Sequence, residues 1–253
     1  PLATPTPEPA PQPTPVPPRP TPTPVPLVVV PQDFVFEFLL DRLPQESRFR
    51  EFNQREMRIF QPETRHQPAI LPDRFGNRPG LKFDNSILFS NLPFRPEDPF
   101  TYVVVARFPP PNTQIALQVM LGVEDTLGTG GGFRIQHHSA LPGSLIFESP
   151  RGNARLTLTR AERERPFVLV FRRTPQNDRA FAGTQSLNLS GTPSPLPPAV
   201  APALQTLQIG DLLDRNLPFF GEIGLIRIYD RALSDREIQV LLADFEQRFG
   251  ALP

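Results

Sequence analysis

The stretch from Pro218 to Gly250 constrains the fold more than any other part of the chain, because it specifies a strand, a tight turn and a capped helix in succession. Glu222 to Tyr229 is mostly apolar, which is typical of a strand covered on both faces. Ser234 and Glu237 then have the S-x-x-E spacing of a capping box. We therefore expect a helix over about residues 234–249. Its apolar face and glycine C-cap are Ile238, Leu241, Leu242, Phe245, Phe249 and Gly250.

The same stretch resembles the closing signature of the concanavalin A-like lectin/glucanase superfamily, in particular its laminin-G-like (LamG) domains. A Phe-Gly pair precedes a strand that ends in Ile-Tyr, followed by Arg-Ala-Leu-Ser and an acidic helix start. Residues 80–90 resemble the early L-x-F-D-G strand pair of this family, with Asn85 where glycine is usual. The matching closing residues are Phe220, Gly221, Glu222, Ile223, Arg227, Ile228, Tyr229, Asp230, Arg231, Ala232, Leu233, Ser234 and Glu237. The resemblance implies an antiparallel jelly-roll sandwich.

The rest of the chain consists of short apolar or alternating segments separated by Gly, Pro and Asn, a pattern typical of an antiparallel sandwich. In the first of these segments we expect Phe34, Phe36 and Phe38 to share one face. The predicted fold is an all-β, antiparallel jelly-roll β-sandwich with one C-terminal α-helix and an extended proline-rich N-terminal arm. The expected strands cover residues 33–40, 57–60, 80–90, 100–108, 115–121, 133–137, 145–148, 156–158, 167–172, 204–209 and 222–229.

The N-terminal arm is expected to span residues 1–31, and the sandwich domain residues 32–253. Alternating prolines force an extended, polyproline-like chain. One interpretation is a semi-rigid spacer with O-glycans on threonines. The other is an assembly device, in which the apolar run Leu27, Val28, Val29 and Val30 forms an edge strand here or pairs with a neighbouring molecule. The candidate O-glycosylation sites are Thr4, Thr6, Thr14, Thr21 and Thr23.

The composition argues against several classes of partner and of binding site. The chain has 26 basic and 26 acidic residues, so no net charge favours nucleic acid or an anionic membrane as a partner. It has no cysteine and hence no disulfide or thiolate metal site. No apolar run of about 20 residues predicts membrane insertion. Because the chain opens at Pro1 without methionine, we expect a removed signal peptide, although an expression boundary would give the same start. The expected location is extracellular or at the cell surface, with a bacterial source.

Catalytic motifs are missing from the sequence. The E-x-D-x-x-E spacing of sandwich glycanases, which places two carboxylates about 5 Å apart, does not occur. The nearest acidic pairs are Glu124-Asp125 in a loop and Glu162 with Glu164 in an alternating-charge turn typical of a solvated face. The sequence therefore predicts that the chain is not an enzyme, with a hydrolase kept as the third alternative.

The sequence also contains candidate residues for metal binding and for N-glycosylation. His137 and His138 are neighbours on a strand, point to opposite faces, and are interpreted as a surface pair rather than metal ligands. Asp84, Asp211 and Asp230 lie where the family resemblance implies Ca²⁺ ligands, although Asp230 would equally cap the turn before the helix. No cofactor is required. Asn188 begins an Asn-Leu-Ser acceptor for N-glycosylation.

Two functions remain. The first is a structural subunit that self-associates into a fibre or layer through its N-terminal arm, which the proline-rich segment and the adjoining apolar run favour. The second is a carbohydrate-binding or adhesion module of a surface protein, which the family resemblance implies. Glycan recognition usually needs an aromatic platform, and the chain has no tryptophan and two tyrosines. A sugar site would have to be built from asparagine, aspartate and arginine side chains in loops.

Overall fold

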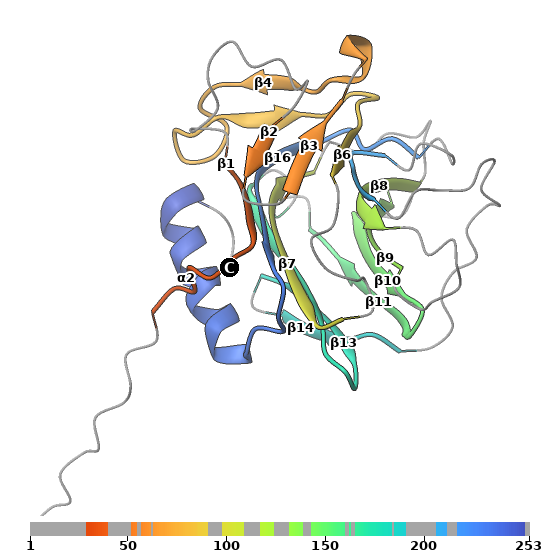
Figure 1. Cartoon of the computed structure of the whole chain (residues 1–253), viewed down its shortest axis with the longest axis vertical. Helices are drawn as coiled ribbons and strands as arrows, with labels where there is room; N and C mark the ends of the chain where they lie inside the picture. Colours follow the sequence, from red (N-terminus) through yellow and green to blue (C-terminus); the bar gives the residue numbers. More distant parts are fainter. Residues whose placement is uncertain are drawn as a thin grey trace, which may run out of the picture.

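The structure, a computed structural model, confirms the predicted all-β antiparallel sandwich with one C-terminal helix (Figure 1). In the described residues, two sheets of eight strands each face one another, and α2 (Asp235–Phe249) lies against the outer side of one of them. The residues that the structure describes are 29–39, 52–54, 57–61, 63–90, 98–108, 117–123, 132–138, 143–159, 162, 165–183, 185–190, 206–211 and 217–250.

The sheet next to the helix is called sheet A, and β7 and β16 form its centre. β16 pairs with β7 along one edge, and with both β1 and β5 along the other edge. Every pairing in the sheet is antiparallel. In spatial order the strands are β14 (Gln185–Asn188), β13 (Asp178–Ala182), β12 (Phe167–Arg173), β7 (Phe100–Arg107), β16 (Glu222–Tyr229), β5 (Gly80–Lys82) and β4 (Ala69–Leu71), with β1 (Phe36–Leu39) beside β16.

The second sheet, sheet B, forms the face of the molecule that is remote from α2 (Figure 1). It is also antiparallel throughout. A short 3-10 helix, η2 (Thr64–His66), follows its β3 strand. In spatial order the strands are β11 (Gly152–Thr157), β10 (Ser144–Ser149), β9 (Phe133–His138), β8 (Leu117–Val123), β15 (Leu207–Ile209), β6 (Leu88–Ser90), β3 (Met57–Phe60) and β2 (Phe52–Gln54).

Sheet A separates two apolar cores. Tyr102 and Val104 of β7 point between the sheets, where they meet Phe133 of β9, whereas Val103 and Val105 point to the helix. This explains why β7, β12 and β16 are apolar at nearly every position rather than at alternate ones. Five buried side chains of α2 close the second core, as their spacing predicts. They are Ile238, Leu241, Leu242, Phe245 and Phe249.

The predicted helix ends are confirmed. Ser234 is the N-cap of α2 and accepts a hydrogen bond from the Glu237 backbone N–H, while the Glu237 carboxylate accepts from the Ser234 backbone N–H. Gly250 is a left-handed C-cap with φ 58°. Asn85 also has a left-handed backbone, φ 55°, and asparagine tolerates this conformation better than most residues. Asn85 therefore adopts the left-handed backbone conformation that glycine, the residue expected at this position from the L-x-F-D-G pattern, adopts most easily.

The first strand differs from its prediction. Phe36 and Phe38 do share a face, stack at 6.5 Å between ring centroids and point into the core between the sheets. Phe34 does not join them, because β1 begins only at Phe36 and the alternation of a strand does not reach Phe34. Its ring instead packs edge-on against Tyr229 on the helix side of sheet A.

Candidate functional site

Polar side chains gather on the outer face of sheet B, where β9, β10 and β11 pair. On β9, Phe133 and Ile135 point into the core, so the alternating residues between and after them point outward. The same alternation applies to β10, where Leu145 and Phe147 are the core residues, and to β11, where Ala154 is. Nine side chains result, three from each strand. We call this set the polar grid: Arg134, Gln136, His138, Ser144, Ile146, Glu148, Asn153, Arg155 and Thr157.

The strand registers align these nine residues in three rows. The first row is Arg134, Glu148 and Asn153; the second is Gln136, Ile146 and Arg155; the third is His138, Ser144 and Thr157. With strands about 4.8 Å apart and residues about 3.4 Å apart along a strand, the grid measures about 10 Å by about 14 Å. Eight of its side chains are polar, and the apolar one, Ile146, is at the centre.

Three side chains at one end of the grid, Arg134, Gln136 and Glu148, interact with one another. The Glu148 carboxylate, only 2% exposed, accepts a hydrogen bond from Gln136 Nε2 at 2.9 Å and forms an ion pair with Arg134. Gln136 is also 2% exposed. Buried polar groups are stable when they are paired in this way. These three residues therefore form a fixed polar base.

The other half of the grid is more open. Arg155 and Thr157 are exposed, and Ile146 is partly exposed between them and Gln136. The Arg155 guanidinium donates a hydrogen bond to Ser144 Oγ at 3.0 Å, which orients it over the neighbouring strand. Burial lowers the pKa of His138, and the positive charge of Arg155 lowers it further. Near neutral pH, His138 is therefore mainly in its neutral form, with one donor and one acceptor nitrogen.

This arrangement suits a ligand rich in hydroxyl groups. Arg155, Thr157 and the partly exposed Asn153 supply donors and acceptors at the surface, whereas Gln136 and Ser144, 2% and 1% exposed, support them from beneath. Ile146 adds a small apolar contact at the centre in place of an aromatic platform. The prediction that a sugar site would rely on asparagine and arginine is consistent with this chemistry. The structure locates such residues on strands, however, and not in loops as the sequence suggested.

Sequence reasoning missed the grid as a unit, although part of its signal was present. In residues 133–138 and 144–149, polar side chains alternate with apolar ones. Asn153 was assigned to a turn, because we expected the next strand only at residues 156–158, whereas β11 begins at Gly152. The pairing of the three strands is not visible in the sequence.

The two histidines differ in environment. They do lie on opposite faces of β9, as predicted, but the interpretation as a surface pair is wrong. His137 is fully buried on the inner side of sheet B, with its ring 5.3 Å from that of Phe108. Only His138 reaches the outer face, because adjacent residues of a strand point in opposite directions.

The candidate calcium ligands are at separate turns. Asp84 is exposed after β5, and Asp230 is exposed after β16. Asp211 is 7% exposed and its Oδ1 accepts a hydrogen bond from the Leu217 backbone N–H at 2.8 Å. Across the described ranges, no three histidine or acidic side chains are grouped in a way that could hold a metal ion. Calcium binding stays a prediction.

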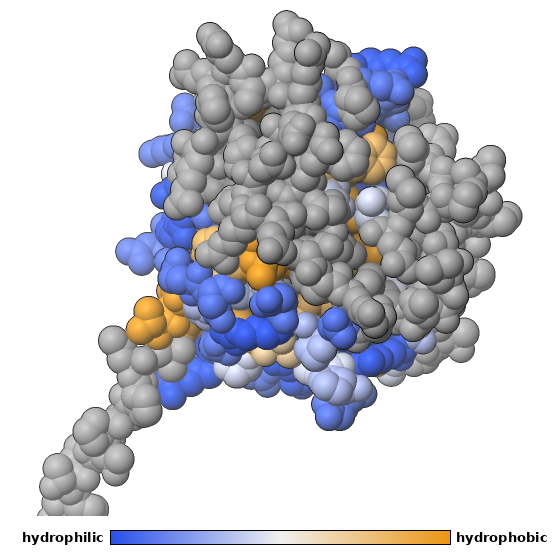
Figure 2. All heavy atoms as spheres, viewed as in Figure 1, coloured by the Kyte–Doolittle hydropathy of each residue, from blue (hydrophilic) through white to orange (hydrophobic). Residues whose placement is uncertain are grey.

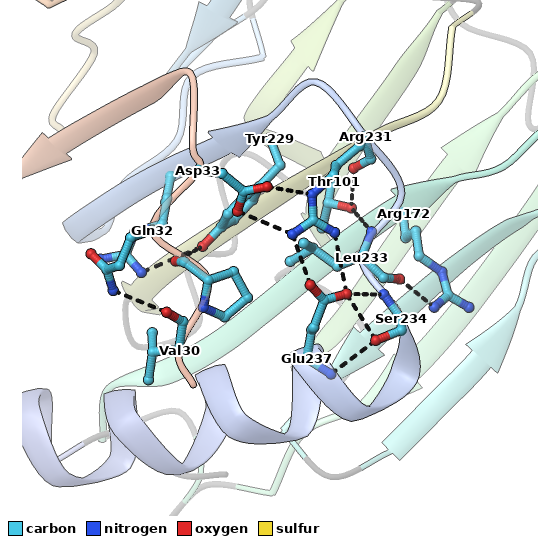
Figure 3. Close-up of polar contacts among 12 residues, drawn as sticks. Val30, Gln32, Asp33, Thr101, Arg172, Tyr229, Arg231, Leu233, Ser234 and Glu237 are labelled. Atoms are coloured by element: carbon cyan, nitrogen blue, oxygen red, sulfur yellow. Dashed lines mark hydrogen bonds and ion pairs between the residues drawn. The ribbon is translucent and has the colours of Figure 1, made fainter. Parts of the chain in front are cut away.

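The N-terminal segment is anchored beside the helix start (Figure 3). Tyr229 Oη donates a hydrogen bond to the Pro31 carbonyl at 3.1 Å, and Arg231 bridges Asp33 and Glu237. Val30 packs against the helix-side core. This geometry shows how residues 30–33 are held by the domain; whether residues 1–31 form a separate unit stays a prediction.

The residues predicted to mediate assembly are only partly described. Leu27 and Val28 lie outside the described residues, as do the five threonines proposed for O-glycosylation. Val29 is 68% exposed, and Figure 2 shows apolar surface where the described chain starts. Asn188 is exposed at the end of β14, and its Oδ1 accepts a hydrogen bond from Arg179 at 2.8 Å. Assembly and N-glycosylation are not tested by these contacts.

The fold is shared with solved structures of low sequence identity. Trypanosoma rangeli sialidase matches with a TM-score of 0.58 and 12% identity over 86% of this chain and 33% of the sialidase chain. The same sialidase in complex with sialic acid matches with a TM-score of 0.57 and 13% identity over 87% of this chain and 34% of the other. The Botulinum neurotoxin serotype D binding domain matches with a TM-score of 0.54 and 9% identity, over 84% and 51% of the two chains.

These likenesses establish a β-sandwich of the kind found in sialidases and a toxin binding domain, and at such identities they show the fold alone. No protein-family model matches the sequence, and no curated protein sequence does. The chain spans about a third of the sialidase chains and about half of the toxin binding domain. In the described part of the chain, no helix has the length and apolar character needed to cross a membrane.

The prediction that the chain is not an enzyme is corrected by this comparison. It rested on missing catalytic motifs, above all E-x-D-x-x-E, which belongs to a single group of sandwich glycanases. The fold of this chain also occurs within sialidases, which are enzymes. The absence of one carboxylate spacing therefore does not exclude catalysis for a chain with this fold, because many chemistries use the same architecture.

Proposed function

We propose that this chain is a carbohydrate-binding module, with the polar grid on the outer face of sheet B as its binding surface. The observation that carries the proposal is the alignment of eight polar side chains around Ile146 on three adjacent strands. Such a surface presents hydrogen-bonding groups at the spacing of the strands, on a rigid support.

The solved structures support this class of ligand. A sialidase with the same fold is described in complex with sialic acid, and another chain with the same fold is a toxin binding domain. The concanavalin A-like, LamG-like resemblance of the C-terminal stretch points to the same superfamily of glycan-binding sandwiches. We keep this family assignment, and an extracellular or cell-surface location, as parts of the proposal.

The self-assembling structural subunit predicted from the arm has less support. Of the apolar run, Val29 is exposed and Val30 packs on the domain itself. Residues 30–33 are hydrogen-bonded to the same chain, which favours an anchored spacer over a free docking strand. Light scattering of the intact chain beside a version that starts at Gln32 tests the alternative: polymers formed only by the intact chain would favour it.

The test of the carbohydrate proposal is a glycan array probed with the intact chain, followed by calorimetric titration of the saccharides that bind. Asn153→Ala combined with Thr157→Ala removes two polar side chains from one edge of the grid, and we expect at least a tenfold loss of affinity. Gln239→Ala combined with Gln247→Ala, on the exposed side of α2, is the matched control and should bind as the wild type does.

Two results would contradict the proposal. If no saccharide on the array binds, the chain is not a carbohydrate-binding module. If saccharides bind but the grid variant retains full affinity while remaining folded, the grid is not the binding surface. Thermal unfolding of each variant, followed by circular dichroism, checks that the fold is retained.

A further inference from the structure

Arg155 differs from most of the arginines that the structure describes. Most of them form ion pairs with carboxylates, as Arg134 does with Glu148 and Arg173 does with Asp178. Arg155 is exposed, and its hydrogen bond goes to the neutral Ser144 hydroxyl at 3.0 Å. Within the described residues it forms no ion pair. Its positive charge is therefore held in place without being neutralised.

The charged side chains of the grid leave one positive charge, that of Arg155, without a neutralising partner in the grid. Arg134 and Glu148 neutralise each other, and His138 is uncharged near neutral pH, so Arg155 gives the grid a net charge of about +1. The side chains next to Arg155 on its own strand and on β10 include Ile146, Ser144 and Thr157, which are neutral. An anionic group that binds next to Arg155 would meet this cation and the exposed Thr157 hydroxyl.

We propose, on the basis of the carbohydrate function above, that the grid recognises acidic saccharides, with Arg155 pairing the carboxylate of a sialic or uronic acid unit. Arginine suits this role because its planar guanidinium has five N–H donors in a fork that matches the two oxygens of a carboxylate. The bond to Ser144 Oγ uses one of these donors and sets the orientation of the guanidinium. Pre-orientation of this kind reduces the entropy lost on binding.

The experiment compares acidic and neutral saccharides that are otherwise alike. Sialyllactose is titrated beside lactose, and trigalacturonic acid beside galactotriose, into the intact chain. We expect at least one acidic member to bind about tenfold or more tightly than its neutral counterpart. Because the added interaction is electrostatic and exposed, this preference should decrease as the salt concentration rises.

Two substitutions of Arg155 distinguish the effect of its charge from the effect of its planar, forked guanidinium. Arg155→Gln keeps a donor for Ser144 but removes the charge, and it should abolish the preference for the acidic saccharide. Arg155→Lys keeps the charge without the fork and should retain part of the preference. Arg165→Gln is the matched control, because Arg165 is also exposed and its replacement changes the net charge equally. This control should keep the full preference.

The outcomes distinguish the two proposals. If neutral saccharides bind as tightly as acidic ones and Arg155→Gln changes neither, the inference about Arg155 is wrong while the carbohydrate function stands. If neither acidic nor neutral saccharides bind, both fail. If Arg165→Gln weakens acidic binding as much as Arg155→Gln does, the effect is one of overall charge, and Arg155 has no specific role.

Discussion

Removing one partner of the buried ion pair between Glu37 and Arg227 should cost far more stability than removing one partner of an exposed pair among the described residues. The two side chains are 3% and 2% exposed and lie beneath α2. Arg227 Nε donates a hydrogen bond to Glu37 Oε1 at 3.0 Å, and its guanidinium lies 4.8 Å from the Phe34 ring centroid and 5.1 Å from that of Phe245. Glu37→Gln would leave a buried arginine without its counter-charge.

The expected loss follows from desolvation. Breaking a buried pair by removing one partner typically costs about 3–5 kcal/mol, since the remaining charge is uncompensated. Glutamine still offers Arg227 an acceptor oxygen, so we expect the lower end, about 3 kcal/mol. For a domain of this size that corresponds to a decrease in melting temperature of roughly 10 °C.

Asp33→Asn is the matched control, because it makes the same chemical change four residues earlier in the same segment. Asp33 and its partner Arg231 are 55% and 37% exposed. A solvent-exposed pair contributes about 0.5 kcal/mol, so this variant should be nearly as stable as the wild type. Urea unfolding followed by far-ultraviolet circular dichroism measures both, which suits a chain without tryptophan.

The reasoning would be refuted if both variants lost the same small amount of stability. A second comparison checks the cause. Replacing both members with apolar residues, Glu37→Leu and Arg227→Met, should recover most of the loss, because the cost of the single variant comes from the unpaired charge and not from the missing bond. A double variant as unstable as Glu37→Gln would instead indicate that packing dominates.

Three further outcomes are expected. The hydrogen bonds from Arg231 lower the pKa of Glu237 from 4.5 to about 2. The stabilisation by Glu237 is therefore present above about pH 4.5 and lost as the pH falls towards 2. In urea unfolding, the free energy of unfolding of Glu237→Gln should decrease by about 1–2 kcal/mol less over this pH range than that of the wild type. Ser234→Ala should lower the unfolding free energy by about 1 kcal/mol through loss of the N-cap, measured by thermal unfolding. Gly210→Ala should destabilise the fold by about 2–4 kcal/mol in urea, because its φ is 91° and a Cβ would lie 2.1 Å from Phe83.

The C-terminal unit was predictable because its signals are local. The capping box needs only Ser234 and Glu237, and the apolar helix face follows from spacing within one helix. The hairpin of β13 and β14 was missed because its own sequence signal is weak and its strands are held by pairing with β12. Asp178 begins β13 and is fully buried because the neighbouring strand β12 presents Arg173 to it at 2.9 Å. A sequence such as Asp-Arg-Ala-Phe-Ala has no strong strand pattern of its own.

The binding surface was less predictable than the strands that form it. Alternation placed Arg134 and Gln136 on one face of β9, but it does not reveal which strands are neighbours or in which register. The grid depends on the short turn at Pro150 and Arg151, which sets β10 against β11. The sequence suggested a longer turn there, and so Arg155 was not recognised as part of a sheet.

The two outer faces of the sandwich have different chemical character, and this difference is the reason for proposing sheet B as the binding face. Sheet A presents Val103, Val105 and Leu225 outward, and α2 covers them with its own apolar face. That side contributes to stability, and its aligned arginines, Arg172 and Arg179, form ion pairs with Asp235 of α2. Sheet B needs only its inner face for the core, so its outer residues are not constrained to be apolar. Polar side chains on that face, with the unneutralised Arg155 among them, are therefore available to the proposed ligand.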